Sequence, residues 1–347
     1  MNFDLLERLC QVAGIGSRER RVRDLVREEL KAHVDEQYVD ALGNLVSIRR
    51  GSGPRIMVAA HMDEIGFVVR HIDDNAFIRV QQVGGFDPRV LAAQRVRVHT
   101  RDGQALAGAL QPGTKPVHLT KAGESRELKL EDLFIDTGLS VDAVRALVSI
   151  GDMVTLDRPS VRMGDLVVSK ALDDRVGLYV MIEALRDVDE TNAEIISVAT
   201  TQEEVGLRGA QTAAFHLEPD IAIALDVTIA GDIPGIPPEE AVTRLGAGTA
   251  IKVFDSSQLP HPTIIETLRS IAESERIPHQ LEVLPRGGTD AGAIQRTRGG
   301  AYTGTISIPC RYMHSANEAA HERDIDASIQ LLARFLERAD LEEIRYR

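Results

Sequence analysis

Four apolar segments of this chain are each followed by side chains that bind metals or move protons. RIMVAAH ends in a histidine, and EIISVATT is followed by two neighbouring glutamates. DIAIALDV holds an aspartate near its end, and GTISIPC precedes another histidine. A further aspartate, in SKALDDRVG, stands at the start of a helical pattern. The resulting candidates are His61, Asp63, Asp173, Glu203, Glu204, Asp226 and His314.

These candidates have the chemistry of a metal site. If the apolar segments are parallel strands of one α/β sheet, their carboxyl ends converge on one crevice, where ligands bind. Carboxylates buried together are costly unless cations compensate their charge. Two imidazoles and three carboxylates suit zinc, cobalt or manganese; they are His61, Asp173, Glu204, Asp226 and His314. A natural arrangement places Asp173 between two metals ~3.5–4 Å apart, the spacing of dinuclear hydrolases.

Two carboxylates remain for other roles. Asp63, two positions after His61, can orient that imidazole without binding the metal itself. Glu203 lies one residue from Glu204 in a turn, so it can point into the crevice without being a ligand. A carboxylate in that position can take a proton from the attacking water and pass it to the leaving amine. We therefore expect Glu203 to be the general base.

The elements that would position these side chains alternate between strands and helices. Residues 18–32 form one apolar helical face, with Ser17 as the expected N-cap. The stretch QYVDALGNLVSIRR predicts two strands joined at Gly43-Asn44, and further helices are expected at 174–187 and at 325–338. Strands alternating with helices predict a parallel or mixed sheet with helices on its faces.

The middle of the chain has a different pattern. RVRVHTRDGQALAGAL alternates across an Asp-Gly turn, and FVVRHID, FIRVQQV and DMVTLD are typical of short strands. Only 140–149 has a helical pattern there. We expect a small β domain at 66–163, inserted into an α/β catalytic domain made of residues 1–65 and 164–347.

The composition excludes several classes of partner. With 53 acidic against 40 basic residues, the net charge of −13 repels nucleic acids and anionic membranes. No apolar run approaches the ~18 residues of a membrane span, and the N-terminus lacks the pattern of a secretory signal. The two cysteines, Cys10 and Cys310, are expected to be buried thiols. A cytoplasmic location is therefore expected.

Six blocks of the sequence resemble a known family in order and spacing. They are AAHMDEIGF, KALDDRVG, TTQEEVGLRGA, LDVTIAGDIPG, RGGTDAGAIQ and IPCRYMHS. The chain resembles the TET-type dinuclear metallo-aminopeptidases, which include glutamyl aminopeptidases and proteins once named endoglucanases. The resemblance implies an enzyme that uses two divalent metal ions, zinc or cobalt, to release N-terminal residues from peptides. By position, His61, Asp173 and Asp226 would hold one metal, and Asp173, Glu204 and His314 the other.

The resemblance also implies an architecture. Members have an α/β sandwich of the zinc-exopeptidase type, interrupted by a β-rich, barrel-like dimerisation domain, and their dimers assemble into tetrahedral dodecamers. In RGGTDAGAIQ, Gly287-Gly288 permits close backbone approach, and Thr289 can cap the next helix. Asp290 has either a role in the substrate pocket or a purely structural one. His118 either reaches another subunit's site or is a loop histidine.

Three other functions are open to the same residues. A related dinuclear hydrolase, such as a deacylase or carboxypeptidase, would use the same metals. A glycoside hydrolase would need carboxyl groups ~5–9.5 Å apart across the scissile bond, which the adjacent Glu203 and Glu204 are poorly placed to supply. A scaffold that kept only the fold would have lost a ligand or the base, and neither is lost here.

Overall fold

The protein consists of two compact units. The computed structural model describes residues 1–115, 117–119, 127–339 and 344. The first unit comprises Met1–Glu64, Ser160–Met313 and Asn317–Arg347, and the second comprises Ile65–Pro159 with His314–Ala316. Each unit has a hydrophobic core of its own.

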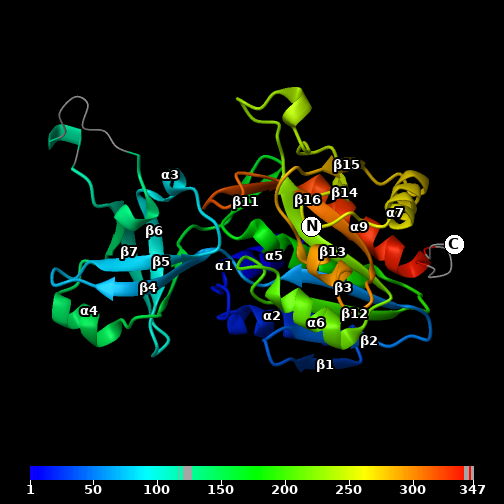
Figure 1. Ribbon diagram of the computed structural model, residues 1–347, viewed down its shortest axis with the longest axis horizontal. Coiled ribbons are helices and arrows are strands. Elements are labelled where there is room, and N and C mark those ends of the chain that lie inside the picture. Colours follow the sequence, from blue (N-terminus) through cyan, green and yellow to red (C-terminus); the bar gives the residue numbers. More distant parts are fainter. Residues whose placement is uncertain (116, 120–126, 340–343, 345–347) are drawn as a thin grey trace. The chain divides into compact units, whose positions relative to one another are not determined.

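A mixed β-sheet forms the centre of the first unit (Figure 1). Its central strands β12, β3, β13 and β16 run parallel, and their apolar side chains alternate between the two faces. The main strand order is β1-β2-β12-β3-β13-β16-β17-β11-β10, with β14 and β15 attached through β16. The strands in the described residues are β1 (Glu36–Val39), β2 (Leu45–Arg49), β3 (Arg55–His61), β10 (Val161–Met163), β11 (Leu166–Ser169), β12 (Glu194–Thr200), β13 (Ile221–Ile229), β14 (Thr249–Phe254), β15 (His279–Val283), β16 (Tyr302–Arg311) and β17 (Glu318–His321).

Helices cover both faces of this sheet. Ile56 and Val58 of β3 pack with one group of helices, α1 (Phe3–Gln11), α2 (Arg20–Leu30), α5 (Leu172–Asp187), α7 (Pro262–Ser274) and α9 (Glu322–Arg338). Met57 and Ala59 of the same strand pack with α6 (Arg208–Leu217) and α8 (Asp290–Gln295) on the opposite face. A short 3₁₀ turn, η3 (Pro238–Glu240), follows β13. This arrangement is the predicted α/β sandwich.

The second unit is built on a closed β-barrel with the strand order β4-β5-β8-β7-β6-β9. Its elements are β4 (Gly66–Ile72), β5 (Ile78–Val83), α3 (Pro88–Leu91), β6 (Gln94–His99), β7 (Ala105–Pro112), η1 (Val117–Leu119), η2 (Leu130–Asp132), β8 (Leu133–Asp136), α4 (Val141–Leu147) and β9 (Met153–Leu156). The predicted hairpin of β6 and β7 is present, and Gly103 in its turn has a φ of +88°. The prediction of a β-rich insert in an α/β fold is confirmed.

Two local predictions about helix caps are corrected by the structure. Ser17 has a φ of +68° and lies outside helix α2, whose N-cap is Glu19. Thr289 occupies the N-cap position of α8, but its side chain makes no capping hydrogen bond. Gly288 does meet a close neighbour, since an added Cβ would lie 2.8 Å from the Cβ of Ser257.

Two predictions from composition are borne out within the described residues. Both cysteines are buried free thiols. No helix in the described part of the chain combines the length and the apolar character needed to cross a bilayer.

Candidate metal and catalytic site

His61 is the last residue of β3 and lies level with the end of the neighbouring strand. β3 pairs in parallel with β12, and His61 stands opposite Thr200, the last residue of that strand. The side chains that follow the two strands therefore leave the sheet at the same edge, as the sequence predicts. The imidazole is buried, with 2% of its surface exposed.

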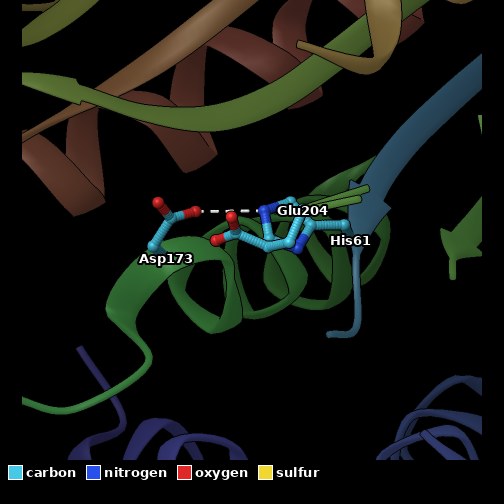
Figure 2. Close-up of side chains that lie close together, drawn as sticks. All are labelled: His61, Asp173 and Glu204. Atoms are coloured by element: carbon cyan, nitrogen blue, oxygen red, sulfur yellow. Dashed lines mark hydrogen bonds and ion pairs between the residues drawn. The ribbon is translucent and has the colours of Figure 1, made fainter. Parts of the chain in front are cut away.

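The ring of His61 is held from two sides. Nδ1 lies 2.8 Å from the backbone carbonyl oxygen of Asp63, which only accepts hydrogen bonds, so Nδ1 carries a hydrogen. Nε2 lies 3.0 Å from Oδ1 of Asp173 (Figure 2). Burial by itself lowers the pKa of His61, but its hydrogen bonds to Asp173 and Asp63 raise this pKa well above the usual value. The negative charge of the Asp173 carboxylate is therefore compensated either by a proton on Nε2 or by a cation bound beside it.

Asp173 and Asp174 divide two tasks at the start of α5. Oδ1 of Asp174 accepts a hydrogen bond from the backbone N–H of Gly177, and Oδ2 accepts one from the backbone N–H of His61. Asp174 thus caps the regular part of α5, which begins after the non-helical residues Asp173 and Asp174, and it fixes the end of β3. Asp173, the preceding residue, is also buried, but its carboxylate points toward the ring of His61 (Figure 2).

Glu203 and Glu204 are positioned through their backbone. The carboxylate of Asp63 accepts hydrogen bonds from both residues, 3.0 Å from N of Glu203 to Oδ1 and 3.2 Å from N of Glu204 to Oδ2. Asp63 is completely buried, and its Oδ1 lies 3.6 Å from Nδ1 of His61. Asp63 therefore contacts His61 mainly through its backbone carbonyl, and its carboxylate binds the backbone of Glu203 and Glu204.

Glu203 points toward His61. Its Oε2 lies 3.8 Å from Nε2 of His61, and 12% of the Glu203 side chain is exposed. Burial raises the pKa of Glu203 well above its usual value. His61 opposes this rise, and the nearby carboxylates of Asp226 and Asp290 add to it. A carboxyl group with a raised pKa binds a proton more readily than an exposed glutamate.

Three of the predicted ligands form one group. Ligand atoms of His61, Asp173 and Glu204 all lie within 4.8 Å of one another (Figure 2). They come from β3, from the start of α5 and from the turn after β12. Imidazole nitrogen and carboxylate oxygen are the donors that zinc and similar divalent ions prefer. A His61 ring anchored through Nδ1 offers Nε2 as the ligand atom, so these residues fit a divalent metal.

Asp226 lies deeper in the sheet than the sequence suggested. Strand β13 continues three residues beyond it to Ile229, although the pairing of β13 with β3 has already ended at Ala224. Burial raises the pKa of Asp226 well above its usual value, and the negative charge of Asp173 adds to this rise. The effect of the Asp173 charge shows that the two carboxylates interact, although Asp226 is not part of the group of three ligands described above.

His314 and His118 lie in different settings. His314, with a φ of +59°, follows the end of β16 by three residues. By its contacts it belongs to the second unit, where its ring lies close to Gly85. His118 is exposed in the 3₁₀ turn η1.

Asp290 begins α8 and is directed at the end of β12. Its Oδ2 accepts a hydrogen bond of 2.5 Å from the hydroxyl of Thr200. Burial raises the pKa of Asp290 to about 6, against the opposing effects of Thr200 and His61.

The sequence analysis missed two other residues of this region, Glu19 and Asn44. They lie in distant parts of the chain and bind the backbone of Gln202 and Thr201, directly before Glu203 and Glu204.

Comparisons with known proteins identify the family of the chain. The family described as M42 glutamyl aminopeptidase matches residues 43–331. A putative aminopeptidase of Acetivibrio thermocellus is 43% identical over 95% of this chain and 97% of its own. The structure of an aminopeptidase from the archaeon Desulfurococcus kamchatkensis has a TM-score of 0.94 at 43% identity, covering 99% of this chain and 96% of that one. The structure of the TET1 peptidase of Pyrococcus horikoshii has a TM-score of 0.86 at 33% identity, covering 97% of this chain and 99% of that one. That peptidase can assemble into a tetrahedron or a large octahedral shell.

Proposed function

The chain belongs to the M42 glutamyl aminopeptidase family, and on this premise we propose that its aminopeptidase activity resides at the group formed by His61, Asp173 and Glu204. The observation that carries this proposal is the convergence of one imidazole and two carboxylates within 4.8 Å. The substrates would be peptides with a free N-terminal amine. The deacylase and glycosidase alternatives gain no support from the family match.

We propose that the site holds two divalent ions, zinc or cobalt. His61, Asp173 and Asp226 would bind one, and Asp173, Glu204 and His314 the other. When bound, such ions polarise the scissile carbonyl group and lower the pKa of a bound water. Asp173 would serve both metals, consistent with its position beside Nε2 of His61.

Glu203 would move the proton. Its carboxylate lies beside His61 without belonging to the group of three ligands, and its backbone is fixed by Asp63. Oε2 of Glu203 would accept the proton of the attacking water and deliver it to the nitrogen of the leaving amine. Asp63 would hold the imidazole through its carbonyl and the base through its carboxylate.

We further propose a dodecamer built from dimers in the cytoplasm. The tetrahedral assembly of the related TET1 peptidase supports the oligomer. The inserted β domain, which we predict at 66–163, would provide the dimer contacts. The net charge of −13 argues against nucleic acid and anionic membranes as partners. Native mass spectrometry tests the assembly, and a monomer at micromolar concentration would contradict it.

A panel of aminoacyl chromogenic amides tests the activity. Metal-stripped protein is assayed alone, with zinc and with cobalt, and an N-acetylated amide serves as the control. We expect metal-dependent cleavage of the free-amine substrates only. Cleavage of the acetylated substrate would indicate a deacylase instead, and no cleavage with either metal would contradict the assignment of the site.

A further inference from the structure

The turn between β12 and α6 is held by side chains from three other parts of the chain. It spans residues 201–207, and its first four residues include Glu203 and Glu204. Each of these four consecutive residues donates its backbone N–H to a buried side-chain oxygen. The four bonds are Thr201 N to Asn44 Oδ1 at 3.0 Å, Gln202 N to Glu19 Oε1 at 3.1 Å, Glu203 N to Asp63 Oδ1 at 3.0 Å and Glu204 N to Asp63 Oδ2 at 3.2 Å.

Glu19 reaches this turn instead of capping its own helix. It occupies the N-cap of α2, yet its side chain makes no capping hydrogen bond there. Its Oε1 accepts from the backbone N–H of Gln202, from the hydroxyl of Thr201 and, at 2.8 Å, from the backbone N–H of Ser17. Only 3% of Glu19 is exposed. The Glu19 carboxylate thus does not cap its own helix. Its buried hydrogen bonds stabilise the distant turn instead.

The turn needs such support because its backbone is strained. Gln202 has a φ of +57°, in the left-handed region that non-glycine residues rarely adopt. Residues in such conformations persist when the surrounding structure fixes them, and they cluster at active sites. The bond from Gln202 N to Glu19 holds the peptide that joins Thr201 to Gln202, directly before the strained residue and one peptide before Glu203. A change at Glu19 therefore alters the direction in which both glutamates leave the turn.

We propose that Glu19 is a positioning residue of the peptidase site, which sets the orientation of Glu203 and Glu204 through the backbone of Gln202. This inference rests on the proposed roles of the two glutamates. Glu19 is not one of the three residues of the candidate metal group. Its loss displaces the base and one ligand, and misplacement by about 1 Å can reduce a rate by ~10²-fold.

Three substitutions at Glu19 separate positioning from helix stability. Glu19→Asp supplies a better N-cap for α2 but retracts the carboxylate from the turn. Glu19→Gln keeps the reach and an acceptor oxygen, and Glu19→Ala removes both. We expect kcat to fall by ~10-fold or more in Glu19→Asp and Glu19→Ala, with KM within ~2-fold of the wild type. We expect Glu19→Gln to retain most of the kcat.

Asp324 provides a matched control. It is also a fully buried carboxylate, and its two oxygens accept backbone N–H bonds of 2.7 Å each from Gly246 and Gly248. Asp324→Ala should lower the melting temperature as Glu19→Ala does while leaving kcat and metal content unchanged. If Glu19→Ala does not fold, Glu19→Asp and Glu19→Gln decide the question.

A wild-type kcat in Glu19→Asp would overturn the inference. So would equal losses of kcat in Glu19→Asp and Glu19→Gln, because the reach of the acceptor would then be irrelevant. Glu203→Gln distinguishes this failure from failure of the proposed function. If Glu203→Gln is inactive while Glu19→Asp has a wild-type kcat, only the role of Glu19 is wrong; if Glu203→Gln is fully active, the assignment of the base is wrong as well.

Discussion

Nε2 of His61 and Oδ1 of Asp173 lie 3.0 Å apart, although 112 residues separate them in the chain. The other ring nitrogen is bound to a backbone carbonyl, so the orientation of the ring is fixed before any ligand arrives. The hydrogen bonds to Asp173 and Asp63 raise the pKa of His61, so a proton on Nε2 competes with a metal for this position. A metal that binds these two atoms must displace that proton, which couples metal binding to proton release.

Asp173→Ala should cost the protein at least one of its metals. The substitution removes the carboxylate whose Oδ1 lies 3.0 Å from Nε2 of His61 and that we place between the two ions. The measurement is metal content per subunit after dialysis, by elemental analysis. Asp187→Ala, at the exposed far end of the same helix α5, is the control and should keep the full metal content. Unchanged stoichiometry in Asp173→Ala would remove its role as a ligand.

Glu203→Gln should retain both metals and lose activity. The amide has nearly the same shape as the carboxylate but cannot accept the proton of the attacking water, and general-base catalysis typically contributes 10²–10⁴-fold. We expect kcat to fall by ~10²-fold or more. Glu218, an exposed residue directly after α6, provides the control, and Glu218→Gln should leave kcat unchanged. A Glu203→Gln variant with wild-type kcat would exclude Glu203 as the base.

The strands and the residues at their ends could be predicted from the sequence. Apolar runs of seven to ten residues followed by polar ligand-type residues mark β3, β12 and β16, and the parallel pairing makes the ends of β3 and β12 coincide. The position of Asp226 inside β13 was missed because Val-Thr-Ile continues the strand without a break. Pattern alone shows the type of an element more reliably than its end.

The bonds that hold the site could not be predicted in the same way. Glu19 lies 183 positions from Gln202, and nothing in the local pattern distinguishes it from an ordinary residue at the start of a helix. The same holds for Asn44, which lies 157 positions from Thr201. Such contacts depend on how distant elements pack, whereas periodicity and capping signals report only on neighbouring residues.

Removing the metals should lower the melting temperature. Without a cation, His61, Asp173 and Asp226 remain buried together, and uncompensated buried charge destabilises the folded state. A ligand at 100 times its Kd stabilises the folded state by ~2.7 kcal/mol. Thermal unfolding is therefore measured before and after chelation and again after zinc is restored. Asp173→Ala should respond less to zinc than the wild type, and equal responses would place the stabilising metal elsewhere.

Lys170→Met should destabilise the first unit through the loss of a buried ion pair. Nζ of Lys170 lies 2.6 Å from Oε2 of Glu64, and 4% and 2% of their side chains are exposed. Glu64 also accepts a hydrogen bond from the backbone N–H of Gly14, so the pair ties the N-terminal segment to the end of β3. Removing one partner of a buried pair costs ~3–5 kcal/mol because the other charge stays buried. Nη2 of Arg175 lies 3.6 Å from Oε1 of Glu64 and still faces the carboxylate after the substitution, so we expect a cost at the lower end of that range.

The corresponding decrease in melting temperature is on the order of 10 °C for a unit of this size. Lys31→Met is the matched control, because Lys31 pairs with Glu28 on the exposed surface of the protein and exposed pairs contribute ~0–1 kcal/mol. The double variant Lys170→Met/Glu64→Leu removes both charges and should recover part of the loss. If the double variant is less stable than Lys170→Met alone, the weakened compensation of the Glu64 charge is not the cause of the loss. The contacts of Glu64 with Arg175 and Gly14 would then stabilise the fold more than its pair with Lys170.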